Sequence, residues 1–110
     1  MHCVDTERER AEAIAQEVKG AAVVADVTKR AGMQRIFDEA HRLFGGSLQG
    51  VVDIVGLAQN GPLSAIRDAK RDWQFVVVLR HACLAIQIGD AALTFIGSFS
   101  GLQSIAGQAA

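Results

Sequence analysis

Two carboxylates, a glycine and a hydroxyl follow four separate apolar runs of this sequence. Asp5 and Asp26 come directly after the first two runs, and Gly56 and Ser98 follow the next two. Carboxylates and hydroxyls hydrogen-bond the polar groups of small molecules, and a glycine lets a ligand approach the backbone closely. The four residues are therefore candidates for one ligand site, provided that the preceding elements bring them together.

Each candidate also has a plain structural interpretation, which stays open at this point. Asp5 and Asp26 are suited to cap the helices that follow them, because aspartate accepts hydrogen bonds from free backbone N–H groups. Gly56 is equally consistent with a turn, and Ser98 with an ordinary loop serine.

The four runs have the composition of strands that are covered on both faces. They are rich in valine and isoleucine and nearly continuous rather than alternating, which is typical of parallel sheets. Residues 21–25, 50–55 and 92–96 form three of these predicted strands, and residues 3–4 form the tail of another.

Helical patterns separate the predicted strands. A capping box at Thr6 and Glu9 opens a helix that stops near Gly20. A second helix is predicted from about residue 28 to residue 45, and a third from about 65 to 87. Alternating strands and helices predict an α/β fold with a parallel sheet of about four strands flanked by helices. The carboxyl ends of such strands share one edge, where ligands bind.

In chain order, these segments resemble the short-chain dehydrogenase/reductase family over nearly all 110 residues. Asp5 matches the acidic residue after the second strand, which binds the adenosine ribose and favours NAD over NADP. Asp26 and Val27 match the segment that contacts the adenine. Gly56 is the one residue retained from the family's Asn-Asn-Ala-Gly motif, here Asp53-Ile54-Val55-Gly56.

The resemblance implies a catalytic serine and an NAD(P)-dependent oxidoreductase acting on a secondary alcohol or ketone. Gly101 selects Ser98 rather than Ser100 as the serine that hydrogen-bonds the substrate oxygen. In the family, a tyrosine transfers the proton and a lysine lowers the tyrosine's pKa. The chain has no tyrosine, and the family spacing places that residue just beyond Ala110.

We therefore expect residues 1–110 to form a single, incomplete Rossmann-like domain that is catalytically inactive by itself. The family's Gly-rich phosphate-binding loop precedes the second strand, so its absence weakens NAD binding. The family's first strand lies between the second and fourth strands. Without it, those two strands either pair directly or leave the two halves poorly joined, and the chain is expected to be marginally stable.

Composition excludes several other classes of protein. The formal net charge of −1, with 11 basic and 12 acidic residues intermixed, predicts neither nucleic-acid binding nor a membrane partner. The first residues lack a signal-peptide pattern, so we expect a cytoplasmic protein. His2, His41 and His81 have no metal-ligand spacing, and no metal site is predicted. Cys3 and Cys83 are predicted to be buried free thiols.

Two alternatives to an oxidoreductase stay open. One is a non-catalytic interaction or residual nucleotide-binding module, because the helix between Trp73 and Ile86 is strongly apolar and the matching family helix packs subunits into a homo-oligomer. A core helix explains that pattern equally well. The other is a phosphoacceptor receiver domain, which Asp53 and Ser98 fit superficially. It is disfavoured because Asp5 has no acidic neighbour.

Overall fold

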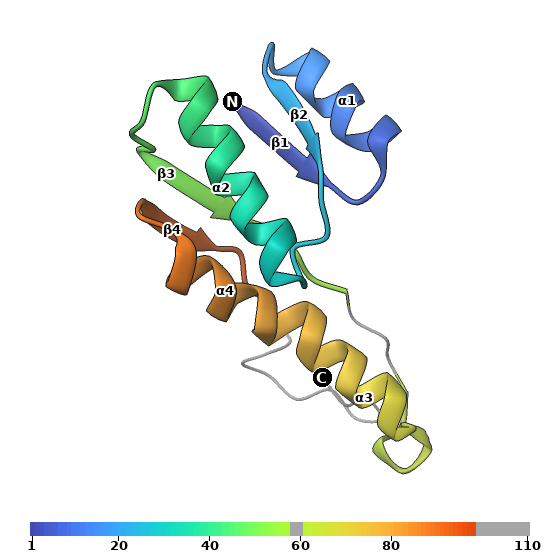
Figure 1. Cartoon of the computed structure of the whole chain (residues 1–110). Coiled ribbons are helices and arrows are strands. Elements are labelled where there is room, and N and C mark those ends of the chain that lie inside the picture. The colour runs from blue at the N-terminus through green and yellow to red at the C-terminus, as the bar shows by residue number, and fades with distance from the viewer. Residues whose placement is uncertain (58–60, 99–110) are drawn as a thin grey trace.

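Four short parallel strands form in the computed structural model, which describes residues 1–57 and 61–98. β1 (His2–Asp5) pairs with β2 (Ala21–Val24), and β3 (Gly50–Asp53) pairs with β4 (Ala92–Phe95). All four arrows point toward the same end of the molecule in Figure 1. The predicted α/β class with parallel strands is confirmed, although β2, β3 and β4 end one or two residues before the predicted ends.

The strands do not form one continuous sheet. Within the described residues there are two separate two-stranded sheets, β1–β2 and β3–β4, so that β1 and β3 are not hydrogen-bonded to each other. Of the two outcomes expected for a chain without the central strand, direct pairing is wrong and separate halves are found. Paired strands lie about 4.8 Å apart, and no described strand is hydrogen-bonded to both β1 and β3.

Helix α1 (Arg8–Glu17) packs against the first sheet through Ala11 and Ala15, which are both buried. The capping box predicted at its start is wrong, because the helix begins at Arg8 and the Thr6 side chain caps nothing in it. The Asp5 carboxylate instead accepts a hydrogen bond from the Glu7 amide at 2.8 Å. Aspartate, serine and threonine side chains all accept hydrogen bonds from backbone amides a few residues later, so they compete for the same amides.

Helix α2 (Arg30–Phe44) covers the second sheet and carries much of the core. It ends at Gly45, whose φ of 76° is the left-handed conformation typical of a C-terminal glycine. The main apolar cluster joins α2 to the helix before β4. Its buried members are Met33, Phe37, Leu84 and Ala85, surrounded by Val27, Leu48, Val51, Ile88 and Leu93.

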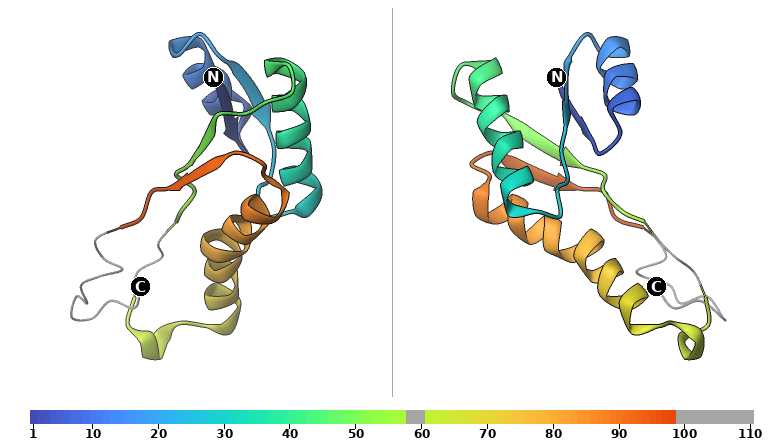
Figure 2. Two further views of the ribbon diagram at one scale, coloured as in Figure 1. Left: turned by 90° about the vertical axis from the view of Figure 1, so that its left-hand side faces the viewer. Right: turned by 45° about the vertical axis from the view of Figure 1, so that its right-hand side comes forward.

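The third predicted helix is confirmed, but it contains an irregular segment. After a 3-10 turn (Leu63–Ala65), α3 (Asp68–Phe75) continues into a π-helical segment (Val76–Arg80) and then α4 (His81–Ile88). The interpretation of its apolar pattern as a core helix holds for one side only. Val77 is buried, whereas Phe75, Val78, Leu79 and Ile86 are each more than half exposed. Figure 2 shows α3 extending away from both sheets.

Across the described ranges, no helix combines the length and apolar character needed to cross a bilayer. Both cysteines are free thiols, but Cys83 is exposed and Cys3 is only partly buried, so their predicted burial is wrong.

Candidate functional site

Asp5 and Asp26 lie beside each other at the carboxyl end of the first sheet. Asp5 is the last residue of β1 and is in register with Val24, the last residue of β2. The Ala25 amide donates a 3.0 Å hydrogen bond to the Asp5 carbonyl, which extends the ladder by one residue. Asp26 follows immediately, so these two predicted residues share one edge.

Gly56 and Ser98 occupy matching positions at the end of the second sheet. Asp53 and Phe95 are in register in the second sheet. Gly56 lies three residues after Asp53, and Ser98 lies three residues after Phe95. Both Gly56 and Ser98 are exposed. The four candidates are therefore arranged as two pairs, one after each sheet, at the end toward which all the strands point (Figure 1). Gly101, which selected Ser98 over Ser100, lies outside the described residues.

The protein's own packing does not require a glycine at position 56. A Cβ atom built on Gly56 would meet no heavy atom within 4 Å, and the residue does not have a positive φ. This open space at the end of the second sheet is compatible with a ligand that approaches the backbone closely.

Asp5 and Asp26 both serve local structure, as their plain interpretation suggested. The Glu7 amide binds only Oδ1 of the partly buried Asp5 carboxylate. Oδ1 of Asp26 accepts hydrogen bonds from the Thr28 amide at 2.9 Å and the Thr28 hydroxyl at 2.5 Å. The bond from the Thr28 hydroxyl is the main reason that the pKa of Asp26 lies below its ordinary value of 3.8. Asp26 is thus an anion at neutral pH in a fixed orientation.

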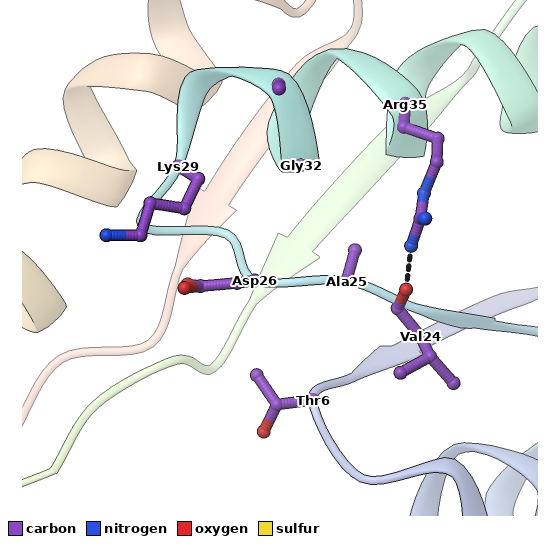
Figure 3. A pocket seen from close by; sticks show the side chains of 8 residues that line it. Thr6, Val24, Ala25, Asp26, Lys29, Gly32 and Arg35 are labelled. Carbon is purple, nitrogen blue, oxygen red and sulfur yellow. Dashed lines mark hydrogen bonds between the residues drawn. The ribbon is translucent and has the colours of Figure 1, made fainter.

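A cavity of about 500 Å³ opens beside Asp26 (Figure 3). In Figure 3 the first turns of α2 form one wall, and the ends of β1 and β2 form the other. The Arg35 guanidinium donates to the Val24 carbonyl at this wall. The lining residues are Thr6, Val24, Ala25, Asp26, Lys29, Ala31, Gly32 and Arg35.

The volume of this cavity lies in the range of small-molecule sites. Small-molecule sites commonly enclose about 300–1,000 Å³ and combine apolar walls with a few polar groups. Asp26, Lys29 and Thr6 supply the polar groups here. Sequence reasoning found Asp26 but missed Lys29, Gly32 and Arg35, because their approach to the strand ends depends on how α2 docks.

A buried acid–base pair adjoins the end of the second sheet, and sequence reasoning missed it as well. The Nε2 atom of His81 lies 3.1 Å from Oδ1 and 3.0 Å from Oδ2 of Asp53. The two side chains are only 3% and 8% exposed. Asp53 was interpreted as a departure from a family motif. No local sequence pattern links it to His81, which is 28 residues away. Among the described residues, no three His, Cys, Asp or Glu side chains form a group able to hold a metal.

The whole described site lies within the range of one family match. Residues 2–110 match the family model described as Enoyl-(Acyl carrier protein) reductase. No curated protein matches the chain in sequence.

Solved structures show the same fold. A Serratia marcescens short-chain dehydrogenase/reductase, a double phenylalanine-to-leucine mutant, has a TM-score of 0.86 and 23% identity, over 96% of this chain and 48% of its own. A short-chain dehydrogenase from Mycobacterium smegmatis has a TM-score of 0.88 and 19% identity, over 97% of this chain and 50% of its own. The chain thus spans about half the length of these two structures.

Proposed function

Because the chain belongs to the short-chain dehydrogenase/reductase family, within the group described as Enoyl-(Acyl carrier protein) reductase, we propose that it is the cofactor-side portion of an NAD(P)-dependent oxidoreductase. The observation that carries this proposal is the arrangement of Asp5, Asp26, Gly56 and Ser98 after four strands that point the same way. Ligands of open α/β sheets bind at that end.

The proposed roles follow from the chemistry of each group. The nicotinamide cofactor, when bound, supplies or accepts the hydride. The Asp5 carboxylate accepts hydrogen bonds from the two ribose hydroxyls and repels a 2′-phosphate, which favours NAD over NADP. Asp26, which lines the cavity, and the Val27 backbone contact the adenine of the cofactor. Gly56 leaves space for the cofactor at the end of the second sheet.

Ser98 is proposed to donate its hydroxyl hydrogen to the substrate oxygen. A secondary alcohol or ketone meets this requirement, and so does the thioester carbonyl of an enoyl substrate such as the family description names. Ser98 orients this oxygen but has no phenol beside it, because the chain contains no tyrosine.

Cofactor binding tests the first part of the proposal. Titration of the purified chain with NADH and NADPH, followed by nucleotide fluorescence, should show tighter binding of NADH. Asp5→Asn removes the repulsion of the 2′-phosphate but keeps a hydrogen-bonding side chain, so it should narrow the difference between the two nucleotides. Glu12→Gln on the exposed side of α1 is the control and should leave the difference unchanged. Equal affinities in the unmodified chain would contradict the role of Asp5.

Turnover tests the second part. With NADH and a panel of ketones and enoyl thioesters, the chain alone should not oxidise NADH above the rate of a protein-free sample, because positioning without a proton donor gives little rate. Turnover that disappears in Ser98→Ala would show that the chain is catalytically complete, against this proposal.

A second candidate function is a non-catalytic interaction module. The exposed apolar side chains of α3, the π-helical segment and α4 favour it, since monomeric proteins rarely leave such residues contiguous and uncovered. We propose a second copy of this chain as the partner, because the apolar stretch of one copy can cover the same stretch of the other.

A further inference from the structure

The Asp53–His81 pair is distinct from the four candidates Asp5, Asp26, Gly56 and Ser98, and it has no part in the proposed chemistry. Burial of a carboxylate is unfavourable unless hydrogen bonds and a partner charge or donor compensate for the lost water. Asp53 has three such contacts: His81 Nε2 on both carboxylate oxygens, and the Val55 amide, which donates to Oδ1 at 2.9 Å.

The geometry fixes which nitrogen of His81 carries the hydrogen. Nε2 faces a carboxylate, so an unprotonated Nε2 would direct its lone pair at two negative oxygens. Nε2 must therefore be the donor. Nδ1 is buried and has no hydrogen-bond partner among the described residues. Of the two tautomers, the one with its hydrogen on Nε2 is favoured, because it leaves an unpaired lone pair rather than an unpaired N–H at the buried Nδ1.

The pair connects two elements that bound the ligand end of the second sheet. His81 is the first residue of α4, directly after the π-helical segment Val76–Arg80. Asp53 is the last residue of β3, and its carboxylate binds the amide of Val55, the residue before Gly56. Since no solvent reaches Nδ1, His81 has no access to a substrate, and its effect must pass through Asp53.

We propose that Asp53 and His81 form a positioning clamp, in which the Nε2–H tautomer of His81 orients the Asp53 carboxylate and the carboxylate fixes the backbone at Val55, next to Gly56. A contribution of this segment to nucleotide binding rests on the function proposed above. The clamp itself does not depend on that function, and it can be tested with no nucleotide present.

Amide hydrogen exchange separates a clamp from a merely stabilising contact. In His81→Leu the Asp53 carboxylate loses its orienting donor, and exchange at the Val55 amide should accelerate about 10- to 100-fold, as expected for losing a hydrogen bond to a charged acceptor. The Ile96 amide is the internal control, because it donates at 2.9 Å to the backbone carbonyl of the same Asp53. Its exchange should change much less. His81→Gln keeps an N–H donor and should restore slow exchange at Val55.

A matched control comes from the second His–Asp pair of the chain. His41 Nε2 lies 3.0 Å from Asp90 Oδ1, but the two side chains are 31% and 59% exposed. His41→Leu should leave Val55 exchange unchanged. Equal acceleration of Val55 and Ile96 in His81→Leu, or no rescue by His81→Gln, would overturn the clamp.

The tautomer can be read from the unmodified chain, even if His81→Leu does not fold. Nitrogen-15 NMR of the histidine rings should show His81 with a protonated Nε2 and an unprotonated Nδ1. A ring with its hydrogen on Nδ1 would overturn the inference, because Nε2 would then be unable to donate to Asp53.

Discussion

The three histidines of the chain lie in three environments that give them different properties. His2 is partly buried in β1, and its Nε2 has no hydrogen-bond partner among the described residues. His41 pairs with an exposed carboxylate, and His81 with a buried one. Burial disfavours the charged form of a histidine, whereas a nearby carboxylate favours it. For His2, burial outweighs the opposing effect of Glu39, so the pKa of His2 lies below its ordinary value of 6.5.

This lowered pKa predicts a loss of stability in mild acid. Below about pH 6.5 the unfolded chain takes up a proton on His2 that the folded chain resists, so the free energy of unfolding should fall as pH decreases until it reaches the folded pKa. His2→Gln should reduce that fall. Urea denaturation of both proteins at about pH 7.5 and about pH 5.5 measures it, with the difference between the proteins isolating His2 from other groups. An identical fall in both would contradict the prediction.

At the level of residues, the sequence predicted positions better than it predicted partners. Asp5, Asp26, Gly56 and Ser98 could be placed at strand ends because each follows a run of apolar residues. The Thr28 hydroxyl on Asp26 was also within reach of sequence reasoning, since the two residues are two positions apart. The Asp53–His81 pair was not, because no local pattern encodes a contact between a strand end and a distant helix.

Among the elements, the close packing of α2 against α4 depends on one glycine. A Cβ atom on Gly89, the residue that follows α4, would lie 2.6 Å from the Ala85 carbonyl oxygen and 2.8 Å from the Phe37 ring. Phe37 belongs to the main apolar cluster, so it cannot move without disturbing the core. The Phe37 ring of α2 therefore packs at the carboxyl end of α4, at Gly89.

Gly89→Ala should lower the free energy of unfolding by about 1–3 kcal/mol, the usual cost of overpacking a core. Gly56→Ala is the control, because its added methyl group meets no atom within 4 Å and should change stability by less than about 0.5 kcal/mol. Urea denaturation compares the two variants. Equal stabilities would show that the α2–α4 contact relaxes freely, against the expectation.

The order of the elements could be predicted, but the details of their ends and joints could not. Valine-rich runs, helical periodicity and Gly45 are local signals, and all were interpreted correctly. The π-helical segment was not predicted, since the all-apolar stretch from Phe75 to Leu79 indicates no particular helix type. Which side of that stretch is covered depends on tertiary packing alone.

For the whole molecule, the uncovered side of the helical stretch from α3 to α4 departs from the covered surface expected of a self-contained domain. Phe75, Val78, Leu79 and Ile86 are exposed along one continuous helical stretch, and burial of such residues stabilises an association by about 25 cal/mol per Å² of apolar surface removed from water. Covering this stretch with the same stretch of a second copy gives a two-fold symmetric dimer.

Size-exclusion chromatography with light scattering should show a mass that rises with concentration toward that of a dimer. Leu79→Glu places a charge within the exposed stretch and should shift the chain to monomer. Leu43→Glu changes a comparably exposed leucine on α2 and should leave the association intact. A strict monomer at all concentrations would exclude the interface.

The division into two sheets has a consequence for how the folded molecule fluctuates. No backbone hydrogen bond joins the β1–β2 ladder to the β3–β4 ladder in the described chain, so thermal opening of one need not break the other. The buried residues of the first half are small, namely Ala11, Ala15, Val23 and Ala25, whereas the second half contains Met33, Phe37 and Leu84. The N-terminal β1–α1–β2 unit should therefore detach first and be the earliest target of a protease, while the α2–α4 core stays folded.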